Sequence, residues 1–243
     1  MTAQPTLMLI ADIAGYTKFM KFHQASLAHA QEIVARLLEV VIDAAGPSLK
    51  LAKLEGDAAF FYMPAPRNGQ FDPALIAGHA AAIYRAFHMR AADLQLNTLC
   101  PCDGCQQSGN LKIKLVGHLG GVAMQKVKQM TELAGVDVIV VHRMLKNSVP
   151  VPEYLLMTKP VHAIVGSPLH EQAAPFALDL DDLGPTEAFY VDLSEFTHTV
   201  PAPQKLPPWR RLARHISLGL RTLPRELGFT KSCVGFRNVP DAH

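Results

Sequence analysis

Two stretches decide the fold of this chain, LMLIADIAGYTKF at residues 7–19 and KLEGDAAFFYMP at residues 53–64. Each holds an apolar run typical of a buried strand, and an aspartate borders each run, Asp12 in the first and Asp57 in the second. A carboxylate at the end of a strand is well placed to bind a divalent cation. Each of the two aspartates could thus offer a carboxylate to a metal ion, and we interpret the other segments as the scaffold of this pair.

The composition is that of a globular protein with a sizeable core. Of the 243 residues, 49% are hydrophobic and 18% are charged, which is not the balance of a disordered chain. No stretch of about twenty apolar residues occurs, so we expect no segment to span a bilayer. The four cysteines are too few for a disulfide framework in a chain of this length. We expect a soluble protein in a reducing, cytoplasmic compartment.

Strand-like and helix-like segments alternate along residues 1–200. Helical spacing of apolar residues covers 24–45, and a second helix begins at Asp72-Pro73 and runs to about residue 94. The run at 136–145 fits either a strand or a helix. The expected strands are 7–11, 49–54, 58–63, 111–118, its hairpin partner 122–127 beyond Gly120-Gly121, 154–157, and the closing pair 176–180 and 188–193. This βαββαβ-like order predicts an α/β (α+β) sandwich with helices on one side of a mainly antiparallel sheet.

The composition changes after residue 200. Residues 201–243 hold eight Lys and Arg against two Asp and Glu, and they open with the proline-rich linker PAPQKLPP. We treat this segment as an appendage to a domain at residues 1–200. Its apolar residues recur at helical spacing and we expect them to pack on the domain, the alternative being an anionic membrane surface. These residues are Trp209, Leu212, Ile216, Leu220 and Leu223. Nucleic-acid binding is not expected, because the charge is modest and no aromatic platform accompanies it.

Four motifs in order resemble the catalytic domain of class III nucleotidyl cyclases, as a divergent bacterial member. ADIAGYTKF at 11–19 resembles their first-strand motif, and KLEGDAAFF at 53–61 resembles their hairpin motif of Lys, two residues, Gly and Asp. VGHLGGV at 116–122 resembles their central strand, and ELAGVDVIVVHRM at 132–144 resembles the segment from the base-selecting acid to the transition-state arginine. The resemblance spans roughly residues 6–193 and implies a ferredoxin-like core.

The resemblance implies a role for each matching residue. Asp12 and Asp57 fall on the two metal-binding aspartates, which implies Mg²⁺ or Mn²⁺ in a two-metal site. Lys53 falls on the lysine that selects the base, and Glu132 falls where adenylyl-type members have an aspartate that reads adenine. Arg143 falls on the arginine that stabilises charge developing on the phosphates. The expected substrate is a nucleoside triphosphate, with ATP favoured, bound by a homodimer.

Two departures from the family pattern lead to competing hypotheses. The family's asparagine, four residues before the arginine, is Ile139 here, and LGPTEAFYV at 183–191 lacks the family's second transition-state lysine. Losing such groups lowers turnover more than binding. One hypothesis is therefore an adenylate cyclase that forms cyclic AMP, and the other is an inactive nucleotide-binding module that regulates through dimerisation.

Taken singly, these residues also have ordinary structural interpretations. An aspartate beside a strand commonly caps a helix or sits in a turn. Lys53 would otherwise be a surface lysine on an exposed strand, and Arg143 a helix-surface arginine paired with a nearby acid. We expect His118 and His142 to be structural residues rather than metal ligands.

Three cysteines, Cys100, Cys102 and Cys105, lie within six residues of the turn-rich stretch LCPCDGCQQSGN at 99–110. Thiolates so close together suit a soft metal, and we consider a structural zinc ion. A fourth ligand would come from Cys233, His118 or a second chain. The alternative is a set of thiols that bind no metal. A zinc-stabilised scaffold without a nucleotide site is thus a third hypothesis.

Overall fold

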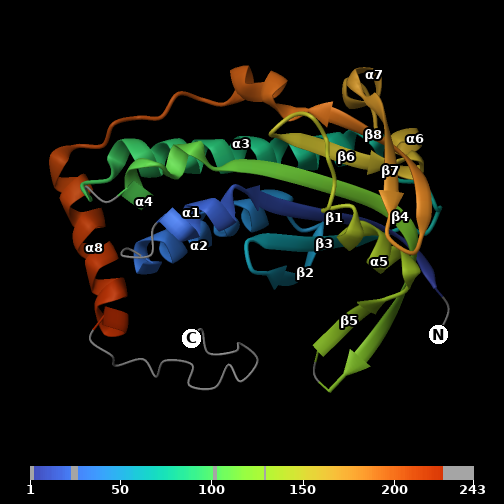
Figure 1. Ribbon diagram of the computed structural model, residues 1–243, viewed down its shortest axis with the longest axis horizontal. Coiled ribbons are helices and arrows are strands. Elements are labelled where there is room, and N and C mark those ends of the chain that lie inside the picture. Colours follow the sequence, from blue (N-terminus) through green and yellow to red (C-terminus); the bar gives the residue numbers. More distant parts are fainter. Residues whose placement is uncertain (1–2, 23–26, 101–102, 129, 227–243) are drawn as a thin grey trace, which may run out of the picture.

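The computed structural model describes residues 3–22, 27–100, 103–128 and 130–226. Over these residues the chain builds one twisted sheet with strand order β2-β3-β1-β4-β6-β8-β7, and β5 pairs with the far part of β4 outside that order (Figure 1). Only β4 and β6 run parallel among the described pairs, so the predicted mainly antiparallel sheet is confirmed. The strands are β1 (Gln4–Ala14), β2 (Lys50–Glu55), β3 (Ala58–Pro64), β4 (Lys112–Val127), β5 (Met130–Ala134), β6 (Tyr154–Thr158), β7 (Ala174–Leu180) and β8 (Gly184–Asp192).

The main helices cover opposite faces of this sheet. The long helices α2 and α3 share a buried cluster with one face, whereas Val141 and Met144 at the end of α5 belong to a second cluster on the other face. The expectation of helices on one side is therefore wrong for α5. The helices are α1 (Tyr16–Phe22), α2 (Leu27–Ala45), α3 (Pro73–Asn97), α4 (Asp103–Gln106), α5 (Val136–Arg143), α6 (Lys159–Ile164), α7 (Leu169–Gln172) and α8 (Pro208–Glu226), with short 3-10 turns η2 (Ser108–Asn110) and η3 (Leu193–Thr199).

Successive side chains of strand β1 point alternately to these two faces. Leu7, Leu9 and Ala11 are buried in the cluster under α2 and α3. Met8 and Ile10 are buried in the cluster shared with α5. Because successive side chains of a strand point to opposite faces, Asp12 continues the Met8 and Ile10 series and lies on the α5 face of the sheet.

Helix α3 begins and packs as its sequence predicts. The Asp72 carboxylate accepts a hydrogen bond from the backbone N–H of Ala74 at 2.9 Å, and Pro73 occupies the first turn. A stripe of apolar residues along α3 faces the core. Its buried members are Ile76, Ala80, Ile83, Phe87 and Ala91.

Strand β4 corrects the predicted hairpin at 111–118 and 122–127. It continues through Gly120 and Gly121 to Val127, and its hairpin partner is β5, with Val127 opposite Met130. The pair of glycines signals a close approach and not a turn. A Cβ atom on Gly120 would collide with the carboxyl group of Asp137 at the start of α5. The run at 136–145, which fitted strand or helix, forms α5.

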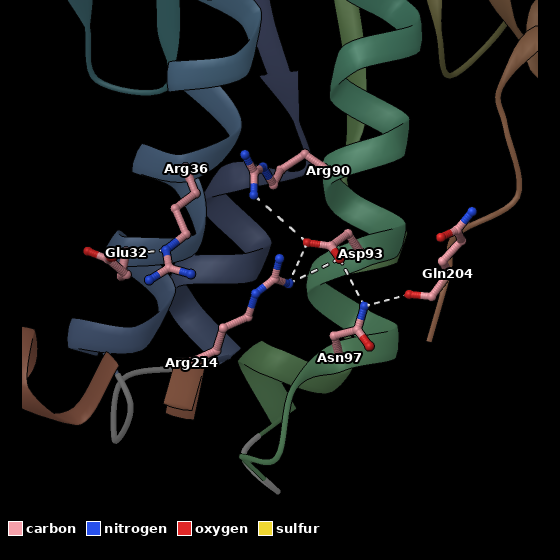
Figure 2. A network of polar contacts seen from close by, with 7 residues as sticks. All are labelled: Glu32, Arg36, Arg90, Asp93, Asn97, Gln204 and Arg214. Atoms are coloured by element: carbon pink, nitrogen blue, oxygen red, sulfur yellow. Dashed lines mark hydrogen bonds and ion pairs between the residues drawn. The ribbon is translucent and has the colours of Figure 1, made fainter. Parts of the chain in front are cut away.

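Helix α8 docks through its arginines. The Arg214 guanidinium donates to both carboxylate oxygens of Asp93 on α3, at 3.1 and 2.8 Å (Figure 2). Arg211 donates to the backbone carbonyl of Thr98 at 3.3 Å. Three of the side chains expected to pack on the domain are exposed instead, at 65% for Trp209, 52% for Leu212 and 53% for Ile216. The predicted packing is wrong for these three, because the basic face of the helix meets the domain, and the side chains of Leu220 and Leu223 lie outside the described residues.

Two further contacts hold the segment before α8 against the end of α3. The Asn97 amide donates to the Gln204 carbonyl at 3.0 Å (Figure 2). The Asn97 side-chain oxygen accepts from the backbone N–H of Leu206 at 2.8 Å. Within the part of the chain that the structure describes, no helix is long and apolar enough to cross a membrane.

Candidate functional site

The two predicted metal ligands lie side by side at the end of β1. Asp57 is in the turn between β2 and β3, next to Ala58, and Ala58 is directly opposite Asp12 in the pairing of β1 with β3. The backbone N–H of Ile13 donates to the carbonyl of Asp57 at 3.2 Å and closes this corner of the sheet. The turn needs Gly56, whose φ of +66° is in the left-handed region. Both carboxylates are half-buried.

The electrostatics of the acid pair favour a bound cation. Burial, and after it the charge of Asp57, raise the pKa of Asp12 to about 6 against the opposing charge of Lys114. Burial also raises the pKa of Asp57, against a hydrogen bond from its own backbone. Both shifts mean that negative charge here is poorly compensated by the chain itself. A divalent cation would supply the missing compensation, and carboxylate oxygens are donors that Mg²⁺ and Mn²⁺ accept.

Lys114 on β4 is a residue of this site that the sequence analysis missed. It stands directly opposite Asp12 in the pairing of β1 with β4. Its ammonium group lies 5.7 Å from the centre of the Tyr154 ring, and the Tyr154 hydroxyl donates to Asn147 at 2.9 Å. The alternation within β4 shows which face Lys114 occupies, but its position opposite Asp12 depends on a strand register that the sequence does not display.

Lys53 is linked to α5 through a second residue that was missed, Glu55. The Lys53 ammonium lies 2.8 Å from a Glu55 carboxylate oxygen, and the His142 ring lies 3.0 Å from the same oxygen. Burial would raise the pKa of Glu55, but its bonds to Lys53 and His142 outweigh burial and lower it. His142 also packs edge-on against Phe60, with ring centres 4.8 Å apart. The expected structural role of His142 agrees with these contacts.

His118 fixes the start of α5. One ring nitrogen lies 2.9 Å from the Thr158 hydroxyl and the other lies 2.9 Å from the Asp137 carboxylate. The second Asp137 oxygen accepts from the backbone N–H of Gly121 at 2.6 Å. Asp137 is in the first turn of α5, where a negative charge is favourable. Both ring nitrogens of His118 therefore already have partners, which argues against His118 as the fourth ligand of the cysteine cluster.

Arg143 ends α5 with an incompletely satisfied guanidinium. One terminal nitrogen donates to Asp182 at 3.1 Å, and the Asp182 side chain is 88% exposed. The other terminal nitrogen is buried and has no hydrogen-bond partner among the described residues. Ile139, at the position where the cyclase resemblance implies an asparagine, is 49% exposed one turn earlier on the same helix. A single exposed ion pair contributes little, so an anion can replace Asp182 readily.

Glu132 lies on the arm formed by β5 and the end of β4, which projects from the sheet (Figure 1). It is opposite Gln125 of β4, and β5 also contacts β2, the strand of Lys53. The structure thus brings Asp12 and Asp57 together, and separately joins the β2 strand of Lys53 to α5 and to the arm. Among the described residues, no ion pair connects either aspartate to Lys53, Glu132 or Arg143.

A histidine that the sequence analysis did not identify, His29 of α2, lies beside the cysteine loop. Cys100 and Cys105 are buried and lie beside His29 of α2. Cys102 and Cys233, both considered as ligands, lie outside the described residues, so their roles stay predictions. A lone histidine in a helical stretch gives no signal of this contact, because the two segments are about seventy residues apart in sequence.

An open groove of about 500 Å³ lies away from the acid pair. It is bounded by α3 and by the segment 201–206, with Arg90, Asp93 and Arg214 on its wall. The acid pair instead opens to the surface. A site that is completed by a second copy need not be a cavity in one copy, so the open position of the acid pair is compatible with ligand binding.

Comparison with known proteins places the chain in a family. It is 43% identical over 209 residues to "Uncharacterized protein Rv2561/Rv2562" of Mycobacterium tuberculosis (strain ATCC 25618 / H37Rv), an alignment that covers 85% of this chain and 94% of that protein. The chain belongs to the family of this mycobacterial protein. The family model described as "Protein of unknown function (DUF2652)" matches residues 34–154. That range contains Lys53, Asp57, Glu132 and Arg143, and it begins after Asp12.

Solved structures of nucleotidyl cyclases share the fold. The adenylyl cyclase CyaB from P. aeruginosa aligns with a TM-score of 0.54 at 10% identity over 84% of this chain and 98% of that chain. The guanylyl cyclase Cya2 aligns with a TM-score of 0.56 at 14% identity over 78% and 92%. The guanylate cyclase domain of RhGC from Catenaria anguillulae, in complex with GTP, aligns with a TM-score of 0.54 at 11% identity over 79% and 97%. The predicted cyclase-type fold is confirmed, and identities this low show the fold alone.

Proposed function

We propose that two copies of this chain bind a nucleoside triphosphate, ATP in preference, together with Mg²⁺ or Mn²⁺, and convert it to the cyclic monophosphate. The observation that carries the proposal is the acid pair. Asp12 and Asp57 lie together at the end of β1 in a cyclase-type sheet, and the pKa of Asp12 is raised to about 6. Structural acids are usually compensated by their own chain, whereas Lys114 compensates this pair only in part.

Asp12 and Asp57 would hold the divalent cations. The cations held by these two carboxylates would supply neutralisation of the triphosphate charge and activation of the attacking sugar hydroxyl. The chain's contribution is placement. The backbone bond from Ile13 to Asp57 sets the two carboxylates on one corner of the sheet, and Lys114 stands beside Asp12 as a positive neighbour. Lys114 also limits the repulsion between the two acids before cations bind.

Lys53 and Glu132 would select the base. The Lys53 side chain is 44% exposed, so its ammonium group can leave Glu55 for an acceptor atom of a purine. His142 keeps Glu55 in place during that exchange, because it bonds the same carboxylate oxygen. Glu132 carries the charge that would accept from an adenine amino group, one methylene further from the backbone than an aspartate.

Arg143 would stabilise the charge that develops on the phosphates. A guanidinium matches phosphate oxygens with paired donors, and here one terminal nitrogen is buried without a partner while the other is held only by the exposed Asp182. Exchange of Asp182 for a phosphate would satisfy both nitrogens. This is the kind of preorganised donor that lowers a transition state.

A second copy explains why the groups lie in two separate places. Asp12 and Asp57 would come from one copy, and Lys53, Glu132 and Arg143 from the other, so a symmetric dimer would contain two composite sites. The cyclase resemblance implies the same arrangement. This proposal therefore includes a homodimer.

An inactive nucleotide-binding module is the second candidate, and a specific observation favours it. Ile139 is exposed on α5 where a hydrogen-bond donor is expected, and β8 carries no lysine. Such a module would keep the metal and base contacts and transmit binding through the dimer. It predicts nucleotide affinity without product.

Titration of ATP and GTP with Mn²⁺ on the purified chain, with assay of the same samples for cyclic product, tests the proposal. We expect binding and product, both lost in Asp57→Asn and retained in the matched control Asp179→Asn, an exposed acid on β7. Binding without product supports the regulatory module. Absence of binding in the wild type contradicts both candidates.

A further inference from the structure

We propose that His29, Cys100 and Cys105 bind a zinc ion that ties the start of α2 to the loop after α3. The three residues come from separate elements, α2, the end of the α3 loop, and α4. One donor atom from each, Nδ1 of His29 and Sγ of each cysteine, lies within 4.8 Å of the other two. The site is independent of the nucleotide site proposed above.

The distances fit tetrahedral coordination by zinc. With Zn–S bonds of about 2.3 Å and Zn–N bonds of about 2.0 Å, tetrahedral angles place nitrogen and sulfur about 3.5 Å apart and two sulfurs about 3.8 Å apart. The His29 Nδ1 atom lies 3.4 Å from the Cys100 sulfur and 4.0 Å from the Cys105 sulfur. All three donor atoms lie within 4.8 Å of one another, so changes of up to about 1 Å in their separations would bring them to their bonded positions.

The donor types point to zinc in particular. Two thiolates and one imidazole form a soft set, which favours zinc over the hard cations expected at Asp12 and Asp57. Both cysteines are buried, at 6% and 4% exposure, and neither is in a disulfide. A thiolate buried in apolar surroundings is unfavourable unless a cation compensates its charge. Zinc provides that compensation and makes burial of both sulfurs favourable.

Hydrogen bonds around the loop hold the two sulfurs in position. The backbone N–H of Cys100 donates to the Thr98 hydroxyl at 3.1 Å, and the Gln106 side chain donates to the Cys100 carbonyl at 3.2 Å. The buried Ser108 hydroxyl donates to the Cys105 carbonyl at 3.1 Å. Preorganised ligands of this kind raise metal affinity, because less chain has to be ordered on binding.

The zinc site is connected to the docked helix α8. Thr98, whose hydroxyl accepts from Cys100, also accepts from Arg211 through its carbonyl at 3.3 Å. A narrow cavity beside Cys105 is lined by residues of α2, α3 and α8, among them Arg36, Asp93 and Arg214. Zinc would thus order the end of the helical layer on which α8 rests. Loss of zinc should loosen α8 as well as the loop.

Zinc analysis of the purified full chain tests the site directly. We expect about one zinc per chain, and more than about 100-fold weaker zinc binding in His29→Ala and Cys105→Ser, since even loss of an outer partner commonly lowers affinity 10- to 100-fold. His79→Asn is the matched control, a half-buried histidine of α3 bonded to Ser48 and not to the cluster. It should retain zinc.

Cobalt exchange on the wild type keeps the test decisive if a variant does not fold. Co²⁺ in place of zinc should show thiolate-to-cobalt charge transfer and the intense visible bands of tetrahedral coordination. The proposal is overturned if the wild type purified from zinc-supplemented medium holds no zinc, if the cobalt spectrum lacks thiolate bands, or if His29→Ala and Cys105→Ser bind zinc as tightly as the wild type.

Discussion

The acid pair at the end of β1 and the His–Cys cluster (His29, Cys100 and Cys105) are built on opposite principles. Asp12 and Asp57 offer hard oxygen donors at a corner open to solvent, and burial raises the pKa of both. The cluster offers soft donors between helices, with both cysteines buried. An open pair of destabilised acids suits cations that arrive and leave with a substrate, whereas a buried thiolate set suits a resident ion. We therefore expect the acid pair to lower the stability of the fold in exchange for function, and the zinc-bound cluster to raise it.

Substitutions at the two places should therefore separate activity from stability. Asp57→Asn is expected to lower cyclic product formation by about 1,000-fold or more, because it removes a ligand of ions that act in the transition state. Its melting temperature should be unchanged or higher, since a poorly compensated charge is removed. Product assay and thermal unfolding of the same preparation measure both. An active Asp57→Asn variant would contradict the role of Asp57 as a ligand of the catalytic cations.

Loss of the cluster should lower stability and leave nucleotide binding nearly unchanged. Cys105→Ser is expected to lower the melting temperature by about 5–10 °C, a few kcal/mol in a chain of this size. Its affinity for ATP with Mn²⁺ should change by less than about twofold, because soft and hard sites select different ions. Thermal unfolding with and without added zinc, alongside nucleotide titration, measures this. If Cys105→Ser were as stable as the wild type, the cluster would have no stabilising role.

The acid pair should also impose a pH dependence on stability. The pKa of Asp12 is about 6 in the folded chain against an ordinary 3.8, so the folded state binds the proton more tightly than the unfolded state. The stabilisation is present below pH 4 and is lost as the pH rises through 6. With no divalent cation added, Asp12→Asn should be more stable than the wild type by about 1–2 kcal/mol at pH 7.5, after allowing for solvent screening.

Denaturant unfolding at several pH values checks this shift. The difference between Asp12→Asn and the wild type should shrink to nothing at pH 4. A difference that stays constant from pH 4 to 7.5 would mean that Asp12 does not titrate as the site requires.

The smallest expected effect concerns α8, which rests beside the cluster. Asp93→Asn removes a partly exposed ion pair with Arg214, so global stability should fall by no more than about 1 kcal/mol. Amide exchange in α8 should nevertheless become faster, while exchange in β1 and β4 stays unchanged. Arg85→Gln, on the same helix as Asp93, serves as a charge-changing control. Unchanged exchange in α8 would show that the Asp93 network (Figure 2) does not hold it.

Local patterns in the sequence were enough to predict the strands of the acid pair and the helix α3. The alternation of β1 places Asp12 on one face, and the Asp72 cap with its apolar stripe defines the start and the buried side of α3. The hairpin prediction failed at Gly120, because the glycine serves the approach of Asp137 from a later helix and not a local turn. Tertiary crowding of this kind leaves no local pattern.

Residues that depend on strand register or on distant convergence could not be predicted. Lys114 joins the acid pair only through its position opposite Asp12, and His29 meets the cysteines only because α2 and the α3 loop pack together. The amphipathic pattern of α8 shows two faces, but it does not say which one docks. The position of Asp93 determines which face of α8 docks, because its carboxylate on α3 accepts from Arg214 of α8.

The central claim is a nucleotide site shared between two copies, and mixing two inactive variants tests it most directly. Asp57→Asn lacks the acid half and Arg143→Ala lacks the other half, so each alone should make almost no cyclic product. In an equal mixture about half of the dimers are mixed and each has one intact site of two, so the account predicts about a quarter of the wild-type activity. A mixture no more active than its separate components, beside an active wild type, would contradict a shared site.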